Sequence, residues 1–375
     1  MPSIALPVSL RGQLLSGTRT FSPASLFAAS EPGVWYDPSD LTTMFQDTAG
    51  TTPVTTPGQT VARINDKSGR GNNATQATTA SRPTYGIVSL GGRRNLLLAT
   101  DTMATQSLTV AAVAHTLAFT GTGTVTLTGA SIAGPLIGTG ASNRVSLTFT
   151  PTAASLTLTV IGSVTLAQLE LGSTATAYQR VTTQYDVTEA GVQSLSYLSF
   201  DGVDDFLVTP TITPGVDKAQ VFAGYRIFNS TSTLIAETST NSFSSTGALS
   251  IAQGAVTGGT GVSSLMTTVG AEGAAKTIPY TGVTTTIFDK SLVGVASEIA
   301  IRLNGSSIAL PNITGTDSGT GNFLAYPIYI GRRAGTSLPF NGQFYSLVVR
   351  FGANLDAATI GNTETYVAGK TGVTI

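Results

Sequence analysis

The sequence is poor in charged and in chemically reactive side chains. Its 375 residues include no cysteine, one histidine, one tryptophan, 19 lysines and arginines, and 20 aspartates and glutamates. The absence of cysteine excludes disulfide scaffolds, thiolate zinc sites, iron–sulfur clusters and cysteine nucleophiles. The single histidine, His115, excludes any site that needs two imidazoles. A net charge of −1 at pH 7 leaves no basic face for phosphates, so we expect no nucleic-acid partner.

What the sequence does contain is typical of a β-protein. Hydrophobic residues make up 41% of the chain, with 42 glycines and abundant threonine and valine, whose branched side chains suit a pleated sheet. No run approaches ~18 apolar residues. Pro2 and Pro7 interrupt the first apolar stretch, which no Lys/Arg cluster precedes. We therefore expect neither membrane insertion nor a secretory signal.

Short alternating segments divide the chain. Between residues 107 and 171, runs such as TVTLTG, RVSLTFT and SLTLTVIG alternate with period two between turn residues, which predicts a compact series of strands. Residues 178–194 are polar and charged and are interpreted as a linker, and a second strand series follows to the C-terminus. Ser22–Ser30 predicts a brief helical turn with a serine cap and Pro23 at its first position. Helical spacing in Asp356–Gly372 predicts a short closing helix.

Two sequence segments resemble opposite ends of one domain family. WYDPSD (35–40) with DKSGRGNNATQ (66–76) is similar to the opening of a laminin-G-like domain of the concanavalin-A-like lectin superfamily. SYLSFDGVDDFL (196–207) and YIGRRAGTSLPFNGQFYSLVVRF (329–351) are similar to its continuation and close. In typical members the DKSG and FDG stretches are a few tens of residues apart, whereas here the whole alternating block separates them. The resemblance implies a second β-domain inserted into a loop of the first.

The resemblance defines the expected domain boundaries. The fold class is all-β: a concanavalin-A-like β-sandwich, or jelly roll, with a second β-sandwich inserted, a short N-terminal arm and a short C-terminal helix. Residues 1–30 form the arm, 31–92 and 191–375 the laminin-G-like sandwich, and 93–190 the insert. In the insert, LAQLELGSTATAYQR resembles the strand that closes a carbohydrate-binding-module jelly roll.

The combination of phrases also resembles virion proteins. RRNLLLAT, GTGTVTLTG, LGSTATAYQRVTTQYDVTEAG and FDGVDDFLVTP together are similar to tail-fibre-like, head-fibre-like or laminin-G-containing structural proteins of tailed bacteriophages. The resemblance covers about residues 30–370 and implies a protein of the virion that other virion proteins hold in place. The first 30 residues do not share it, and we expect them to encode attachment to the particle.

Catalytic chemistry finds little support in the sequence. His115 lies in a predicted strand with no aspartate and serine arranged around it, so we interpret it as structural. The E-x-D-x-x-E strand motif that places two carboxylates on one face in related glycan-cleaving enzymes is absent. Asp201, Asp204 and Asp205 surround Gly202, where carboxylates often stabilise a turn. The same three residues are candidate Ca²⁺ ligands, because hard cations take several oxygen ligands. No other cofactor is expected.

The resemblance to the lectin superfamily also implies glycan binding. Sugar sites combine an aromatic face with hydrogen-bonding side chains, and the weak candidates are Trp35, Tyr36, Arg332 and Arg333. A core position for Trp35 and an exposed loop position for the two arginines are the competing interpretations.

These observations predict a phage virion structural protein that is not an enzyme. It would be a decoration or fibre/adhesin component, attached through its N-terminal arm to capsid, neck or tail proteins and contacting host-surface glycans. We expect a homo-oligomer because particle attachment sites are symmetric. The oligomer that we expect is a trimer. Two alternatives stay open: a polysaccharide-degrading enzyme of the tail-spike type, and a purely capsid-stabilising protein with no ligand.

Overall fold

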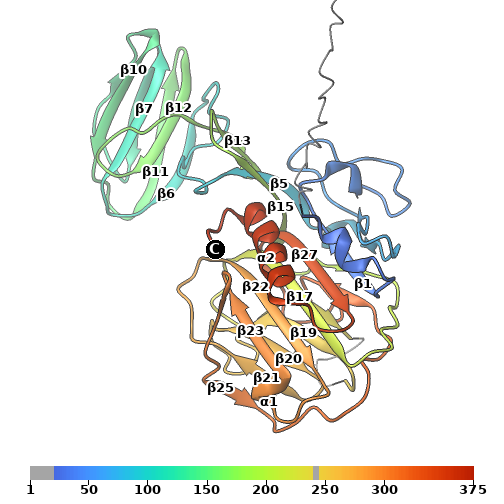
Figure 1. The fold of residues 1–375 in the computed structure, drawn as a ribbon. Helices are drawn as coiled ribbons and strands as arrows, with labels where there is room; N and C mark the ends of the chain where they lie inside the picture. Colours follow the sequence, from blue (N-terminus) through green and yellow to red (C-terminus); the bar gives the residue numbers. More distant parts are fainter. Residues whose placement is uncertain (1–20, 240–244) are drawn as a thin grey trace, which may run out of the picture.

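The computed structural model describes residues 21–239 and 245–375, and this part of the chain folds almost entirely into β-strands (Figure 1). Four sheets form two sandwiches, a large one and a small one. The predicted all-β class is therefore confirmed. Most of the predicted N-terminal arm lies outside the described residues. The helices in the described ranges are too short or too polar to cross a lipid bilayer.

The first sheet of the large sandwich, here named the β27 sheet, has ten strands. Nine follow one path: β13 (Gln179–Thr183), β14 (Asp186–Glu189), β5 (Thr84–Ser89), β15 (Ser194–Asp201), β27 (Asn341–Phe351), β17 (Lys218–Ile227), β22 (Tyr280–Asp289), β23 (Ile299–Leu303) and β24 (Ser306–Ser307). The tenth strand, β1 (Gly33–Tyr36), pairs with β27 antiparallel. The pairing of β1 with β27 therefore joins opposite ends of the chain in one sheet.

The second sheet, the β18 sheet, also has ten strands. In order these are β2 (Met44–Phe45), β3 (Arg63–Ile64), β4 (Ala74–Thr75), β16 (Leu207–Val208), β26 (Ile328–Ile330), β18 (Thr233–Thr238), β19 (Leu249–Gln253), β20 (Val262–Met266), β21 (Val269–Glu272) and β25 (Asn312–Thr314). The core lies between the two sheets. On β15, Leu198 and Phe200 point into it, and the Phe200 ring contacts those of Phe340 and Phe344 at centroid distances of 5.6 and 6.2 Å.

The opposite face of the β27 sheet carries the C-terminal helix. Helix α2 (Ala357–Thr371) begins at Asp356, whose side chain accepts a hydrogen bond from the Thr359 N–H, and it packs over β17, β22 and β27 (Figure 1). Gly224 on β17 permits this close packing, because a Cβ there would lie 2.8 Å from Val367 Cγ1 and 2.6 Å from Thr371 Cγ2. The predicted closing helix is therefore confirmed.

The predicted N-terminal helical turn also exists, as a short 3₁₀ helix. It is η1 (Pro23–Phe27), with the Ser22 side chain accepting a hydrogen bond from the Ala24 N–H. Leu26 and Phe27 are buried with residues of α2, so this turn is part of the large sandwich. The remaining helical elements are η2 (Leu41–Thr43), η3 (Thr79–Ser81) and α1 (Val295–Glu298).

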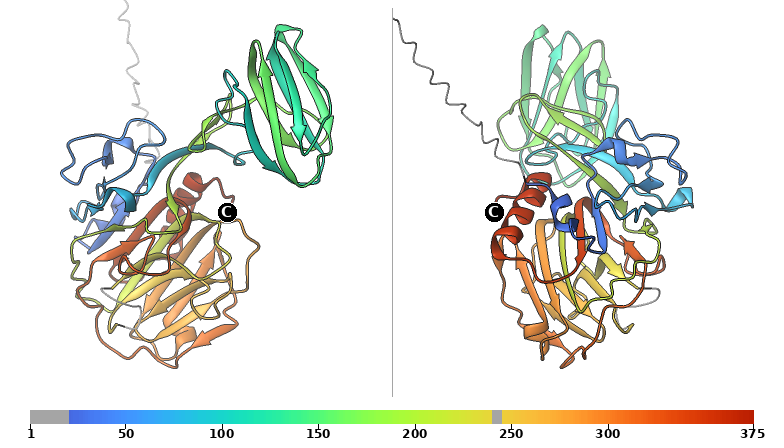
Figure 2. Two further views of the ribbon diagram at one scale, coloured as in Figure 1. Left: turned by 180° about the vertical axis from the view of Figure 1, so that it is seen from behind. Right: turned by 45° about the vertical axis from the view of Figure 1, so that its right-hand side comes forward.

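The alternating block forms the small sandwich, which stands apart from the large one (Figure 2). One sheet contains β10 (Gly140–Phe149), β7 (His115–Gly121) and β12 (Val164–Leu171); the other contains β6 (Gln106–Val110), β11 (Ala154–Ile161), β8 (Thr124–Gly129) and β9 (Leu136–Ile137). Leucines, valines and phenylalanines of the alternating runs fill a separate core. His115 is buried, with Nδ1 2.8 Å from the Val113 carbonyl oxygen.

The segment 178–194 is not the linker that its polarity suggested. Strands β13 and β14 form an antiparallel hairpin, and β14 runs parallel to β5 at Ile87. Val181 and Val187 of this hairpin are buried against Leu195, Tyr197 and Tyr345 of the β27 sheet. The hairpin therefore extends the large sheet, although it lies within residues 93–190. Polar and charged side chains predominate in this segment of the sequence, and the two apolar residues that face one side, Val181 and Val187, form too weak a pattern to predict a strand pair.

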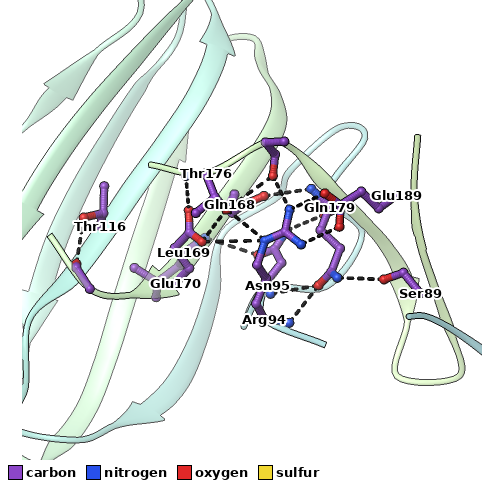
Figure 3. Close-up of polar contacts among 12 residues, drawn as sticks. Ser89, Arg94, Asn95, Thr116, Gln168, Leu169, Glu170, Thr176, Gln179 and Glu189 are labelled. Carbon is purple, nitrogen blue, oxygen red and sulfur yellow. Dashed lines mark hydrogen bonds and ion pairs between the residues drawn. The ribbon is translucent and has the colours of Figure 1, made fainter. Parts of the chain in front are cut away.

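A buried polar network joins the two sandwiches (Figure 3). Its centre is Gln179, which is fully buried. The Gln179 Oε1 accepts hydrogen bonds from the backbone N–H groups of Arg94 (2.8 Å) and Asn95 (3.1 Å). Its Nε2 donates to Ser89 Oγ at 2.8 Å. One side chain thus connects β13, the end of β5 and the chain that enters the small sandwich.

Charged groups complete the same network. The Arg94 guanidinium pairs with Glu189 of β14 and lies 3.7 Å from Glu170 of β12. Glu170 in turn accepts hydrogen bonds from the Thr176 N–H (2.7 Å) and hydroxyl (2.6 Å). Because these carboxylates come from both sandwiches, Arg94 links the two bodies directly.

Candidate functional site

The two aromatic residues proposed from the sequence are buried. Trp35 is 6% exposed and lies beneath helix α2, with its ring 5.8 Å from that of Tyr366 and the Lys67 Nζ 4.7 Å away. Tyr36 is fully buried and its hydroxyl donates a hydrogen bond to the Asn72 carbonyl oxygen. Their burial leaves no ring face free to stack on a sugar, so the positions support the core interpretation. A glycan-binding role for them stays a prediction.

The two proposed arginines lie on the other sheet, just after β26. Arg333 Nε donates to Glu237 Oε2 at 2.9 Å, and the Glu237 side chain is fully buried. Arg332 donates to the Thr336 carbonyl oxygen at 3.2 Å. Arg333 therefore neutralises a buried carboxylate, and the structure does not bring either arginine together with Trp35 and Tyr36 in one site.

The three aspartates do cluster. One carboxylate oxygen from each of Asp201, Asp204 and Asp205 lies within 4.8 Å of the others. Each also has a local role: Asp201 accepts from the Val203 N–H (2.7 Å), Asp204 from the Ser81 hydroxyl (2.6 Å), and Asp205 from the Asp201 N–H (3.0 Å). Ca²⁺ takes six to eight oxygen ligands. Asp201 and Asp205 bind N–H groups of their own turn and Asp204 binds Ser81 of η3, which fits a structural role, and Ca²⁺ binding stays a prediction.

Asp205 is the unusual member of this cluster. It is 6% exposed, and burial, together with the charges of Asp201 and Asp204, raises the pKa of its carboxyl to about 7. A carboxyl that holds its proton near neutral pH can donate as well as accept a hydrogen bond. The Asp205 carboxyl can therefore both donate and accept a hydrogen bond. It lies at one end of a surface groove.

This groove combines aromatic and polar walls, and we call it the outer groove. Its volume is about 530 Å³, and its floor is the outer face of β5, β15 and β27. The turn Gln184–Tyr185 between β13 and β14 forms one wall, Phe228 lies on another side, and Asp201 and Asp205 lie at one end. The volume falls within the usual range for ligand sites.

A row of polar side chains crosses the floor of the groove. The strand register places Thr84 opposite Ser199, Ser199 opposite Gln343, and Gln343 opposite Arg226. Because alternate residues of a strand face the same side, the core positions of Leu198 and Phe200 turn Ser199 outward. Hydroxyl, carboxamide and guanidinium groups thus lie side by side across four strands, spaced by the strand separation of about 4.8 Å.

An aromatic pair flanks this row on the same face of the sheet. Tyr197 and Tyr345 lie on β15 and β27 with ring centroids 6.0 Å apart at 62°. The Tyr345 hydroxyl donates to Gln343 Oε1 at 2.8 Å, which orients the Gln343 carboxamide. The Tyr197 ring lies over Gly86, where a Cβ would be 2.4 Å from its Cζ. Burial raises the pKa of Tyr197 to about 12, so its hydroxyl stays protonated.

Sequence reasoning did not select most of these residues. Ser199, Asn341 and Gln343 lie inside the two segments that carried the laminin-G resemblance, yet of the residues that line the groove only Asp201 and Asp205 were proposed, and for a metal. A signal was present: in SFD and FNGQF, polar residues alternate with buried phenylalanines. Alternation separates the two faces of a strand but does not tell which face is hollow.

Comparisons with known proteins assign no family. No protein-family profile matches the sequence, and no curated protein matches it. Among solved structures, similarity is found to the CBM40 domain of a Ruminococcus gnavus IT-sialidase bound to α2,3-sialyllactose (14% identity, covering 39% of this chain and 82% of that one, TM-score 0.28). A second is domain 4 of AbnA, a GH43 arabinanase from Geobacillus stearothermophilus, with arabinotriose (13%, 51% and 82%, TM-score 0.32). These TM-scores are too low to assign this chain a ligand, and neither protein is a laminin-G or phage protein.

Proposed function

We propose that this chain is a non-enzymatic, glycan-binding component of a bacteriophage particle, and that the outer groove is the glycan site. The observation that carries the glycan proposal is the row from Thr84 to Gln343, with Asp201 and Asp205 lining the groove beside it. Sugars present a ring of hydroxyl groups that donate and accept hydrogen bonds. The hydroxyl, carboxamide and carboxyl groups of the row can likewise donate and accept hydrogen bonds.

The aromatic surface beside this row suits the apolar face of a sugar ring. Phe228 is 41% exposed at the edge of the groove, and Tyr185 is partly exposed in the opposite wall. Aromatic side chains beside well-placed polar groups are common in small-ligand sites. Contacts of this kind are individually weak, and repeated copies on a particle would convert them into strong attachment by avidity.

The test is binding of purified protein to host surface polysaccharides and to a glycan array. The double variant Asn341→Ala/Gln343→Ala removes two carboxamides from the groove, and Asn143→Ala, an exposed amide of the small sandwich, is the matched control. We expect the double variant to lose binding about ten- to hundredfold and the control to bind like the wild type. Unchanged binding by a folded double variant would contradict the assignment.

A second candidate function is polysaccharide cleavage, and one observation favours it. Asp205 has a pKa raised to about 7 and lies beside Asp201 in the groove, and glycosidases use two neighbouring carboxyl groups, one of which keeps its proton to act as the acid. Reducing-end release from bound polysaccharide, measured with wild type and with Asp204→Asn/Asp205→Asn, decides between the two. We expect no release from either protein. Release that the double substitution abolishes would establish the enzyme instead.

The particle role rests on the sequence resemblance to phage structural proteins. We propose that residues N-terminal to η1 attach the protein to capsid, neck or tail proteins, and that it assembles there as a homo-oligomer, with a trimer expected. Because Leu26 and Phe27 are buried in the large sandwich, a test deletion should remove residues 1–20 only. The truncated protein should keep its melting temperature and fail to co-purify with particles. Retention of the folded truncated protein on particles would contradict attachment by this segment.

A further inference from the structure

One arginine beside the groove lacks the carboxylate partner that three other arginines of low exposure have. Arg350 pairs with Glu31 at 3.0 Å, Arg302 with Glu364 at 2.7 Å, and Arg333 with Glu237 at 2.9 Å. Arg226, on β17, is partly buried, and its Nε is buried without a hydrogen-bond partner. Its guanidinium lies 5.4 Å from the Phe228 ring centroid. Among the described residues, no ion pair joins it to a carboxylate.

The rest of the chain supplies no missing partner either. Residues 1–20 and 240–244, which complete the sequence, contain neither aspartate nor glutamate. A partly buried cation without a counter-ion is unfavourable, because the desolvation of its charge is not offset by an ion pair. Sites that bind anions keep such a cation available.

A second guanidinium lines the same hollow. Arg93 and Arg226 border a hollow of about 200 Å³ that shares Gln184, Tyr197, Phe228 and Gln343 with the outer groove and therefore adjoins it. Arg93 is fixed by donating to the carbonyl oxygens of residues 95, 96 and 97 at 2.7–3.0 Å. Its donors thus go to neutral carbonyl groups, and its charge stays without a carboxylate partner.

The two adjoining hollows therefore differ in charge. The carboxylate of Asp201 borders the outer groove, and the guanidinium groups of Arg93 and Arg226 border the smaller hollow. Both arginines act on Tyr197 between them, where their positive charge opposes the rise of its pKa that burial causes. A neutral sugar would gain nothing from this polarity. A sugar chain with one anionic substituent would be held in one direction.

From this arrangement we infer that the groove selects acidic glycans and that Arg226, assisted by Arg93, binds the carboxylate of a sugar acid. This inference rests on the proposed glycan function and specifies the class of glycan. The planar guanidinium matches a carboxylate with two parallel N–H···O hydrogen bonds. Gln343, opposite Arg226 in the register, would bind neighbouring hydroxyl groups, and the aspartates would bind neutral residues further along the chain.

The experiment compares matched polysaccharides. Uronic-acid-containing and sialic-acid-containing polysaccharides are tested beside the same polymers with carboxyl groups reduced to alcohols, and beside a phosphate-bearing and a neutral polymer. The proteins are the full-length wild type, Arg226→Gln, Arg226→Lys, and the control Arg70→Gln, which removes an exposed arginine outside the groove. Binding is measured by ligand-observed NMR at two salt concentrations, and thermal melting checks each fold.

We expect the wild type to bind a carboxylated polymer at least tenfold more strongly than its reduced form, with binding weakened by salt. Arg226→Gln should lose that preference without losing stability, Arg226→Lys should keep part of it, and Arg70→Gln should keep all of it. Preference for the phosphate-bearing polymer, or equal binding of reduced and carboxylated polymers, would overturn the inference and leave the glycan function standing. Binding of no polymer would overturn both.

Discussion

At the scale of single residues, Asp205 connects the groove to the stability of the protein. Burial raises the pKa of its carboxyl from 3.8 to about 7, so the folded protein holds this proton more tightly than the unfolded chain does. Below about pH 4 both states are protonated and the group has no effect. Between pH 4 and 7 only the unfolded state loses the proton, so the contribution of Asp205 to stability falls as pH rises.

Replacing Asp205 should remove this pH dependence. Asp205→Asn keeps an oxygen that accepts the hydrogen bond from the Asp201 N–H but carries no charge. We expect the free energy of unfolding to rise by about 1–3 kcal/mol at pH 8 and to stay unchanged at pH 4, as measured by urea unfolding in EDTA. The exposed Asp317→Asn is the control. Parallel pH profiles for wild type and Asp205→Asn would show that the carboxyl titrates normally.

Gly86 controls the position of the Tyr197 ring at the bottom of the groove. In Gly86→Ala the new Cβ would overlap the Tyr197 ring, at 2.4 Å from Cζ, so the ring must move. We expect a loss of about 1–3 kcal/mol in stability and weaker glycan binding. Gly361→Ala in α2, where a Cβ meets nothing within 4 Å, should instead stabilise by about 0.5–1 kcal/mol. Equal effects of the two substitutions in thermal unfolding would contradict this packing argument.

The residue scale is also where the sequence was least informative. The aromatic pair Trp35–Tyr36 was a reasonable sugar-stacking candidate, but α2, more than 300 residues later in the sequence, covers Trp35. The groove residues Ser199 and Gln343 carry no motif of their own. Their proximity follows from the pairing of β15 with β27, which local sequence does not encode.

At the scale of elements, the hairpin β13–β14 has two roles, because its turn forms a wall of the groove and its first residue joins the sandwiches. Gln179→Ala would leave the buried N–H groups of Arg94 and Asn95 without their acceptor. We expect a loss of about 2–4 kcal/mol, measured by chemical unfolding, and a wider range of angles between the sandwiches, measured by small-angle X-ray scattering. The exposed Gln193→Ala is the control. A wild-type scattering profile for Gln179→Ala would contradict the role of this network.

Elements with a strong local signal were predicted correctly, and those defined by distant partners were not. Period-two alternation identified the strands of the small sandwich, and the spacing of Ile360, Thr363 and Val367 identified α2, because both patterns are local. In the sequence, the charges of the hairpin β13–β14 indicate a linker. In the structure, one of these charges, Glu189, pairs with Arg94 on a distant segment. That pairing, the ladder with β5 and the burial of Val181 and Val187 all come from distant parts of the chain.

At the scale of the whole molecule, low charge and two separate sandwiches suit a component of a large assembly. The small sandwich stands apart from the large one, and the hairpin that joins them also walls the groove (Figures 1 and 2). A chain with 10% charged residues has little electrostatic repulsion between copies. Several copies side by side would present several grooves to one polysaccharide.

The most direct test of the central claim is a crystal structure of the protein with an oligosaccharide that it binds on the array. The account predicts sugar density in the outer groove, with hydroxyl groups hydrogen-bonded to Gln343 and Asp201 and an acidic substituent beside Arg226. Sugar bound only to the small sandwich, or only beside Arg332 and Arg333, would contradict it.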